Sequence, residues 1–417
     1  MRRVRPWRTH DELGAAAFVA ALFVCGVTTA AAQGTLDLPI GDPARAQIQA
    51  PVVLDAITDT ANGELIAPAE LARRLAGTRI LFIGEEHTNL EFHRVQLRVI
   101  EALRAAGREA LIGLEMFPYT QQDVLDRWVR GDLAEQEFID SSLWYENWSH
   151  HWGHYRDIFL YAQTNKLAMY GINAPRELVR KVRTDGFDSL SADEREHLPP
   201  AFDLSSDQHR QMFTASFSAD DALHLTSLNE EQREGMYRAQ VTWDGAMGWN
   251  AMRSLEQHGG PNAIMVVLIG AGHVTYDLGS ARQIRRYFKG RISSLVPVPV
   301  RDALDKPQAS VRASYANFIW GVPAAEGPGL PVLGVSLAGR IGKAPTAVIQ
   351  IDERSPATAA GVQLGDVLLS LDGVPLKSGS DLQRQTGVYG WGDSAQLLVK
   401  RGEEELTLTV AFRRPGR

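Results

Sequence analysis

Short runs of consecutive apolar residues recur along the first three quarters of the chain. They cover residues 79–83, 110–114, 167–172 and 263–269, and each is followed by polar residues. Unbroken apolar runs are typical of strands that are buried on both faces, and their alternation with helical patterns is typical of parallel sheets. The pattern therefore predicts an α/β domain, over residues 65–305, with a mainly parallel sheet flanked by helices.

Helical patterns surround these runs. Residues 68–76 form an amphipathic pattern that ends at Gly77, and apolar residues spaced from Leu90 to Leu103 predict a helix capped by Thr88 or Asn89. The long segment between the third and fourth runs has helical patterns at 192–198, 218–225 and 229–257. Because a simple crossover needs far fewer residues, we expect a helical subdomain inserted at 177–260.

The C-terminal part of the chain has a different pattern. Residues 306–327 are rich in proline and glycine and are expected to start as a loop and end as a linker. Short β-type runs follow at 333–336, 347–351, 367–371, 396–400 and 405–411. This pattern predicts a small β-rich module over residues 328–412.

The N-terminal residues 1–32 have the features of a signal peptide. Arginines at positions 2, 3, 5 and 8 precede an apolar stretch at 14–27, and three alanines end the segment. The apolar stretch is shorter than the about 20 residues of a membrane span. We therefore expect an exported protein, in the periplasm or associated with a membrane on the outer face of the inner membrane or at the outer membrane. A retained N-terminal anchor is the alternative, and residues 33–64 are expected to be an irregular lead-in.

Composition excludes several kinds of chemistry. Cys25, in the predicted signal peptide, is the only cysteine, so the mature chain would have no disulfide, thiolate metal site or cysteine nucleophile. The formal net charge is −7 and there is no block of basic residues, which argues against nucleic-acid binding.

Polar residues with chemical capacity follow all four apolar runs. Ligands of parallel sheets bind at the carboxyl ends of the strands, so these residues should converge. Glu115 needs a partner if it is buried, and His87 and His273 could provide one, through a shared metal ion or as a histidine–carboxylate pair. Taken alone, each residue could equally be a cap or a surface group. The converging set comprises Glu85, Glu86, His87, Glu115, Asn173, Arg176 and His273.

A second cluster lies at residues 144–156. Its aromatic residues and histidines recur at helical spacing, with His150 and His154 four residues apart. One interpretation is a flat aromatic wall with imidazole and phenol ligands, which suits a porphyrin. The other is an aromatic core stripe with exposed histidines.

Several motifs in this order resemble a known family. They are Ile-Leu-Phe-Ile-Gly-Glu-Glu-His (80–87), Gly-Leu-Glu-Met-Phe (113–117), Trp-Gly-His-Tyr-Arg-Asp-Ile (152–158), Gly-Ile-Asn-Ala-Pro-Arg (171–176) and Gly-Ala-Gly-His-Val (270–274). Together they resemble the ChaN-like haem-binding family, which belongs with the Tiki/TraB and erythromycin-esterase-like folds. The resemblance implies haem binding and iron uptake at the cell envelope. Candidate haem-binding residues are His87, His93, His151, His154, Tyr155, Asn173, Arg176 and His273.

The same motifs also resemble a metal-dependent hydrolase branch of this superfamily. That resemblance implies a divalent ion such as zinc or manganese at His87, Glu115 and His273, with Glu86 and Glu115 as catalytic residues. The usual zinc-protease helix motif and serine-hydrolase elbow are absent from the sequence. A scaffold with a degenerate site is a third interpretation, and whether the protein is an enzyme stays open.

The C-terminal module resembles a bacterial PDZ domain. The motif runs from Leu333-Gly334-Val335-Ser336 through Ser355-Pro356-Ala357 and Ala360-Gly361-Val362 to Gly365-Asp366-Val367 and Leu371-Asp372-Gly373. The resemblance implies that residues 333–336 bind the C-terminus of an envelope protein or peptide, which would add as a strand beside a helix at 380–386. A PDZ domain that only packs against its neighbour is the alternative. A homodimer is also left open.

Overall fold

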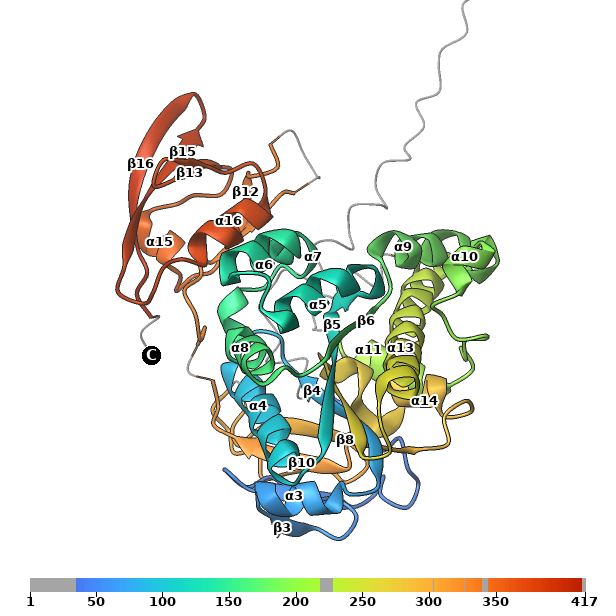
Figure 1. Ribbon diagram of the computed structural model, residues 1–417. Coiled ribbons are helices and arrows are strands. Elements are labelled where there is room, and N and C mark those ends of the chain that lie inside the picture. The colour runs from blue at the N-terminus through green and yellow to red at the C-terminus, as the bar shows by residue number, and fades with distance from the viewer. Residues whose placement is uncertain (1–34, 218–227, 303, 326, 340–343, 415–417) are drawn as a thin grey trace, which may run out of the picture. The chain divides into compact units, whose positions relative to one another are not determined.

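The computed structural model describes residues 35–217, 228–302, 304–325, 327–339 and 344–414. The predicted signal peptide lies outside these ranges. The described residues form two compact units, one ending at Gly329 and one beginning at Leu330 (Figure 1). Among these residues, no helix combines the length and apolar character that crossing a membrane requires.

The first unit is built on an eight-stranded sheet with the order β3-β2-β10-β8-β4-β7-β5-β6. The six strands from β10 to β6 are parallel, and β2 and β3 add antiparallel to that edge. This confirms the predicted fold class. The strands are β2 (Ile57–Asp59), β3 (Glu64–Ile66), β4 (Thr78–Glu85), β5 (Glu109–Pro118), β6 (Met169–Asn173), β7 (Ala263–Gly270), β8 (Arg291–Pro299) and β10 (Phe318–Val322).

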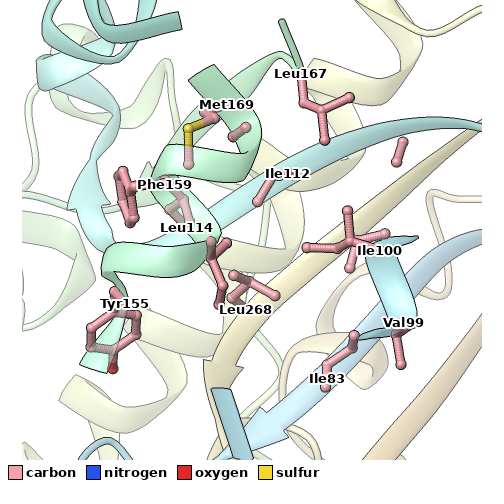
Figure 2. Packing of buried hydrophobic residues seen from close by; sticks show 14 of the residues in the cluster. Ile83, Val99, Ile100, Ile112, Leu114, Tyr155, Phe159, Leu167, Met169 and Leu268 are labelled. Carbon is pink, nitrogen blue, oxygen red and sulfur yellow. The ribbon is translucent and has the colours of Figure 1, made fainter. Parts of the chain in front are cut away.

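Both faces of the sheet are covered by other residues, and strand β7 is apolar throughout because its side chains pack into a core on each face. Val266 and Leu268 pack into one core, whereas Met265 and Val267 pack into the other, as the twofold period of a strand requires. Figure 2 shows Leu268 in the first core, beside Ile112 and Leu114 of β5. Helices on that side are α3 (Pro68–Arg74), α4 (Leu90–Ala105), α5 (Gln122–Arg130), α6 (Glu135–Ser141), α7 (Trp144–Asn147) and α8 (Arg156–Asn165).

Helices between β6 and β7 form the predicted insertion. They are α9 (Arg176–Asp185), α10 (Ala192–Arg195), α11 (Asp207–Ala215) and α13 (Glu230–His258), and α14 (Ser280–Ile284) follows β7. The helix expected at 229–257 is confirmed, whereas the one at 192–198 is a single turn. The helix expected at 218–225 lies outside the described residues. Buried α13 residues such as Met247 and Ala251 cover the second face of the sheet.

Two segments differ from the prediction. Residues 306–327 do not form a linker, because they contain β9 (Ser310–Arg312) and β10, and Trp320 of β10 is fully buried. The prolines and glycines that suggested a linker flank a short apolar strand. The lead-in at 33–64 is also structured: β1 (Gln49–Pro51) pairs with β9, and β2 joins the main sheet.

The second unit has the predicted β-rich pattern. A β11–β12 pair accompanies a four-stranded sheet with the order β14-β13-β15-β16, around a core that includes Leu368 and Leu397. Its elements are β11 (Val335–Leu337), β12 (Val348–Ile351), α15 (Pro356–Ala360), β13 (Val367–Leu371), β14 (Val374–Pro375), α16 (Gly379–Thr386), β15 (Ser394–Arg401) and β16 (Glu404–Ala411).

Candidate functional site

The register of the sheet brings two predicted site residues, Glu85 and Glu115, together. Strand β7 lies between β4 and β5, with Glu85 alongside Gly270 and Leu114 alongside Leu268. Glu115 is the next residue of β5, so its carboxylate and that of Glu85 lie on either side of the end of β7. The convergence expected at the carboxyl ends of the strands is therefore present.

Glu85 is a fully buried carboxylate with three hydrogen-bond donors around it. Its Oε1 atom lies 2.9 Å from His87 Nδ1 and accepts from Tyr155 Oη at 2.5 Å, and its Oε2 atom accepts from Gln96 Nε2 at 2.5 Å. Burial opposes the charged form, but His93, His87 and Tyr155 outweigh it and lower the pKa of Glu85 to about 2. Glu85 is therefore ionised and holds a proton on His87 Nδ1, which leaves Nε2 for a ligand.

A second histidine–carboxylate pair approaches Glu115 from the other side. His273 Nδ1 lies 2.7 Å from Asp244 Oδ1, and His273 Nε2 lies 3.5 Å from Glu115 Oε1. Burial lowers the pKa of His273, but the carboxylates of Asp244 and Glu115 outweigh it, so the pKa is raised overall. The same balance raises the pKa of His87, through Glu85 and Glu115.

Gly270, the last residue of β7, lies between His87 and Glu115. Its N–H donates to Glu115 Oε2 at 2.5 Å. A methyl group at Gly270 would lie 3.3 Å from His87 Nε2 and 3.5 Å from Glu115 Oε2. Both side chains therefore lie close to the Cα atom of Gly270. His87, Glu115 and His273 are thus neighbours. Nevertheless, no group of three or more His, Cys, Asp or Glu residues within the described ranges is arranged to hold a metal ion, and the metal site stays a prediction.

The segment 144–156 is not the continuous helix that its spacing suggested. Helix α7 ends at Asn147, Ser149 adopts a left-handed φ of 64°, and only a 3₁₀ turn follows at Trp152–His154. His150 and His154 therefore do not share a helical face. Trp144, Trp152 and Tyr155 are buried in the first core, so most of the expected aromatic wall is core packing.

Two of the predicted haem-binding residues, His93 and Tyr155, have no free ligand atom in this arrangement. His93 is buried, with Nε2 3.0 Å from the His87 carbonyl and Nδ1 3.1 Å from Gln96 Oε1. Tyr155 donates to Glu85, and burial first, then Glu85, raises its pKa well above the usual value. His151 and His154 differ from these two: His151 Nδ1 accepts from the Gly153 N–H at 2.9 Å, but His151 Nε2 and His154 Nδ1 are buried without a hydrogen-bond partner among the described residues.

Asn173 and Arg176 connect elements around the site. Asn173 Nδ2 donates to the Glu115 carbonyl at 2.9 Å, and Arg176 donates to the Asn147 carbonyl. These contacts hold β6 and α9 against the segments that carry Glu115 and the α7 turn. The side chains of Asn173 and Arg176 therefore hold the backbone at Glu115 and Asn147.

Trp148 and His150, which were not among the predicted site residues, lie against His87. The His87 ring packs edge-on to Trp148, with 4.7 Å between centroids, and lies 5.2 Å from His150. Burial and then the neighbouring His87 lower the pKa of His150 to about 3, so its imidazole is neutral at neutral pH. The composition of residues 144–156 was a signal, but only the turn after α7 shows which histidine faces His87.

A shallow surface hollow of about 430 Å³ lies elsewhere, between α9 and α10. It is lined by charged and polar side chains: Glu177, Arg180, Lys181, Thr184, Asp185 and Glu194. None of the residues predicted for the strand-edge site lines it, so the hollow is separate from that site.

The fold and this site define a class of α/β protein with a mainly parallel sheet and histidine–carboxylate pairs at the carboxyl ends of its strands. The model of the family described as haem-binding uptake, Tiki superfamily, ChaN matches residues 71–284, about half of the chain, and the protein belongs to that family. A PDZ-domain model matches residues 331–412.

Similar proteins cover each unit separately. The chain is 26% identical over 264 residues to Protein RETICULATA-RELATED 5, chloroplastic, of Arabidopsis thaliana, covering 59% of this chain and 34% of that protein. Its C-terminal unit is 42% identical over 64 residues to a probable periplasmic serine endoprotease DegP-like of Pseudomonas fulva, covering 15% of this chain and 13% of that protein. The chain thus spans about a third or less of these curated relatives.

Two solved structures are similar to the first unit. One shows cofacial haem binding to ChaN of Campylobacter jejuni, with 17% identity, a TM-score of 0.48 and coverage of 63% of this chain and 95% of that one. The other is an erythromycin esterase mutant in its open conformation, with 14% identity, a TM-score of 0.40 and coverage of 65% and 97%.

Proposed function

We propose that the α/β unit binds haem at the strand-edge site and that His87 is the residue that faces the iron. The observation that carries this proposal is the Glu85–His87 pair: Glu85 holds His87 Nδ1, and Nε2 belongs to a ring whose side chain is 21% exposed. Bound haem would supply an iron ion, which the imidazole of His87 could hold. The other residues of the site orient that ring.

The surroundings of His87 fit a porphyrin. Trp148 provides a half-buried aromatic surface beside the ring, and His150 provides a second imidazole. A histidine must be neutral to ligate a metal. The pKa of about 3 keeps His150 neutral, whereas His87, whose pKa is raised by Glu85 and Glu115 despite its burial, would release a proton when it binds. By contrast, binding through His93 or Tyr155 would first have to break their internal hydrogen bonds.

We also propose that the PDZ unit binds the C-terminus of an envelope protein. Residues 333–336, which the PDZ resemblance assigns to peptide binding, lead into β11, which pairs with β12 in a two-stranded sheet. Val335, Ser336 and Leu337 of β11 are all partly exposed. Export by residues 1–32 and a role in iron uptake at the envelope complete this proposal.

An absorption titration with haemin tests the haem proposal. The full chain should give a saturable change of the Soret band at low molar excess of haemin. A shift that stays linear with added haemin, as non-specific adsorption would give, contradicts the proposal. For the PDZ unit, a peptide with a free C-terminal carboxylate should bind and the same peptide with an amidated end should not.

The two histidine–carboxylate pairs that flank Glu115 favour one second candidate, a hydrolase of the metal-dependent type. His87, Glu115 and His273 would hold zinc or manganese, which would lower the pKa of a bound water. Glu86 would be the catalytic acid or base, and burial raises its pKa despite the Asn89 hydrogen bond. Turnover of a simple ester or peptide that is lost in Glu86→Gln, with haemin affinity unchanged, would support this candidate over haem binding.

A further inference from the structure

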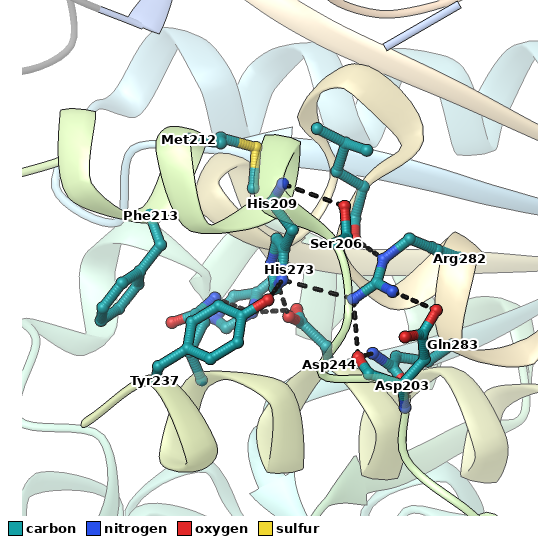
Figure 3. Close-up of polar contacts among 12 residues, drawn as sticks. Asp203, Ser206, His209, Met212, Phe213, Tyr237, Asp244, His273, Arg282 and Gln283 are labelled. Atoms are coloured by element: carbon teal, nitrogen blue, oxygen red, sulfur yellow. Dashed lines mark hydrogen bonds and ion pairs between the residues drawn. The ribbon is translucent and has the colours of Figure 1, made fainter. Parts of the chain in front are cut away.

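Asp244 lies buried between two histidines that belong to different elements. It is on α13, in the inserted helices, and its side chain has no exposed surface. Its Oδ1 atom lies 2.7 Å from His273 Nδ1, at the end of β7, and its Oδ2 atom lies 3.2 Å from Nε2 of His209, on α11 (Figure 3). One carboxylate thus connects α11 with the strand-edge site.

Arg282 determines which nitrogen of His209 carries the proton. Its Nη2 atom lies 3.4 Å from His209 Nδ1, and a guanidinium group can only donate a hydrogen bond. The Tyr237 hydroxyl, 2.9 Å from the same nitrogen, can donate as well. Nδ1 of His209 is therefore an acceptor, so the proton of the neutral ring is on Nε2, the nitrogen 3.2 Å from Asp244 Oδ2. These two atoms form a close polar contact and not a hydrogen bond, and neither has a hydrogen-bond partner among the described residues.

The other oxygen of Asp244 fixes His273 in the same way. A carboxylate only accepts, so His273 Nδ1 carries a proton that it donates to Oδ1. In the neutral ring, the lone pair is then on Nε2, the nitrogen that lies 3.5 Å from Glu115. Gln240, whose amide lies 3.0 Å from His273 Nδ1, can turn its oxygen toward the same proton.

We propose that His209 and Asp244 are positioning residues of the strand-edge site: His209 orients Asp244, and Asp244 fixes His273 with Nε2 toward Glu115. The inserted helices α11 and α13 thus contribute residues that position the side chains of the site. This inference rests on the proposed function only for the identity of the ligand, because the position of the ring proton is a property of the unliganded chain. Partners of this kind change ligand affinity by about 10- to 100-fold when they are replaced.

The test is a two-bond ¹⁵N–¹H correlation spectrum of the histidine rings in the full chain, at a pH high enough for His273 to be neutral. The wild type should carry the His273 proton on Nδ1. In Asp244→Asn, the donor on His209 Nε2 should attract the new carbonyl, so the new amide would face His273 Nδ1 and move its proton to Nε2. A wild-type proton on Nε2, or a proton that stays on Nδ1 in Asp244→Asn, overturns the proposal.

Two further variants separate positioning from folding. His209→Gln keeps a donor near Asp244 and should retain the Nδ1 proton and the wild-type haemin affinity, whereas His209→Leu should weaken haemin binding. His197→Gln is the matched control, because this exposed histidine of the same inserted segment stacks on Tyr119, away from Asp244. Absence of haemin binding by the wild type would refute the proposed function, yet the ring spectra would still decide the role of Asp244.

Discussion

His87 Nδ1 lies 2.9 Å from Glu85 Oε1, two residues earlier at the end of β4. This short contact decides which nitrogen of His87 is available, because the carboxylate keeps the proton on Nδ1 and Nε2 is turned toward Glu115. His273 and Asp244 repeat the arrangement on the opposite side of Glu115. The site is therefore a carboxylate between two imidazoles, each of which is held from behind by another carboxylate.

Gly270→Ala should weaken haemin binding. The added methyl group would lie 3.1 Å from His87 Cε1, closer than most Cβ contacts, and would push the ring away from its place beside Glu115. Overpacking of this kind costs about 1–3 kcal/mol of stability. Haemin affinity by absorption titration and urea unfolding would measure both effects.

Gly272→Ala is the matched control for this change, since a methyl group two residues further on meets no atom within 4 Å. It should bind haemin as the wild type does. Equal affinities of the two alanine variants would show that His87 does not depend on the space over Gly270.

Tyr155→Phe should lower stability but retain haem binding. The substitution removes a buried hydrogen bond to the ionised Glu85, and bonds to charged groups contribute about 1.5–3 kcal/mol. Because the hydroxyl is engaged inside the core, it is not the iron ligand in our proposal. Urea unfolding should show the loss, and a haemin titration should give a wild-type Soret band.

Tyr161→Phe serves as the comparison for Tyr155. Its hydroxyl accepts from Arg104 at 2.9 Å in a partly exposed position, so the free energy of unfolding should change little. Loss of the Soret change in Tyr155→Phe, at a temperature where the variant is folded, would identify the phenol as the ligand and contradict the role of His87.

Acid should destabilise the protein partly through His150. Its pKa is about 3 in the folded chain, below the ordinary histidine value of 6.5, so the unfolded chain binds the proton more readily between these values. The stability contribution is therefore complete above about pH 6.5 and is lost as the pH falls toward 3. His150→Gln should show a smaller decrease in unfolding free energy between about pH 7.5, above this range, and about pH 5, inside it.

Urea unfolding at these two pH values, beside His197→Gln, measures that difference. The His197 variant should follow the wild type, since substitution of an exposed side chain usually changes the free energy of unfolding little. An identical pH dependence of His150→Gln and the wild type would show that His150 is accessible to protons in the folded state.

In the PDZ unit, Gly334→Ala should be much more damaging than Gly373→Ala. Both glycines have a φ of +79°, so the backbone strain of an alanine is similar at the two positions. Only at Gly334 would the methyl group also collide with Ser355, 2.1 Å from its Cβ. Thermal unfolding and the affinity for a free C-terminal peptide should both fall further in Gly334→Ala, and equal losses would contradict the clash.

The strands and the convergence at their ends could be predicted from the sequence because they depend on local patterns. Each of the four predicted strands has an unbroken apolar run. Once these strands are taken as parallel, the residues that follow them, among them Glu85, Glu115 and His273, must lie at one edge of the sheet. The carboxylate of Asp244, which holds His273, could not be predicted in this way. Asp244 lies in a helix 29 residues before His273, and only the packing of the insertion shows that they meet.

Other features were beyond local patterns for a similar reason. The residues 144–156 have the spacing of a helix, but α7 ends at Asn147 and Ser149 adopts a positive φ. Strand β10 was not predicted, because it is short and flanked by prolines and glycines. Its pairing with β8, an earlier segment of the chain, is what makes it a strand. Pairing between distant segments decides such elements, and a single sequence does not show that pairing.

Haemin titrations of His87→Ala and His197→Ala test the central claim most directly. His87→Ala leaves Glu85 with Tyr155 and Gln96 as donors, so the variant should fold. We predict that it loses the saturable Soret change while His197→Ala retains it. A Soret change of unaltered position and affinity in His87→Ala would contradict the assignment of the haem site to the edge of the sheet.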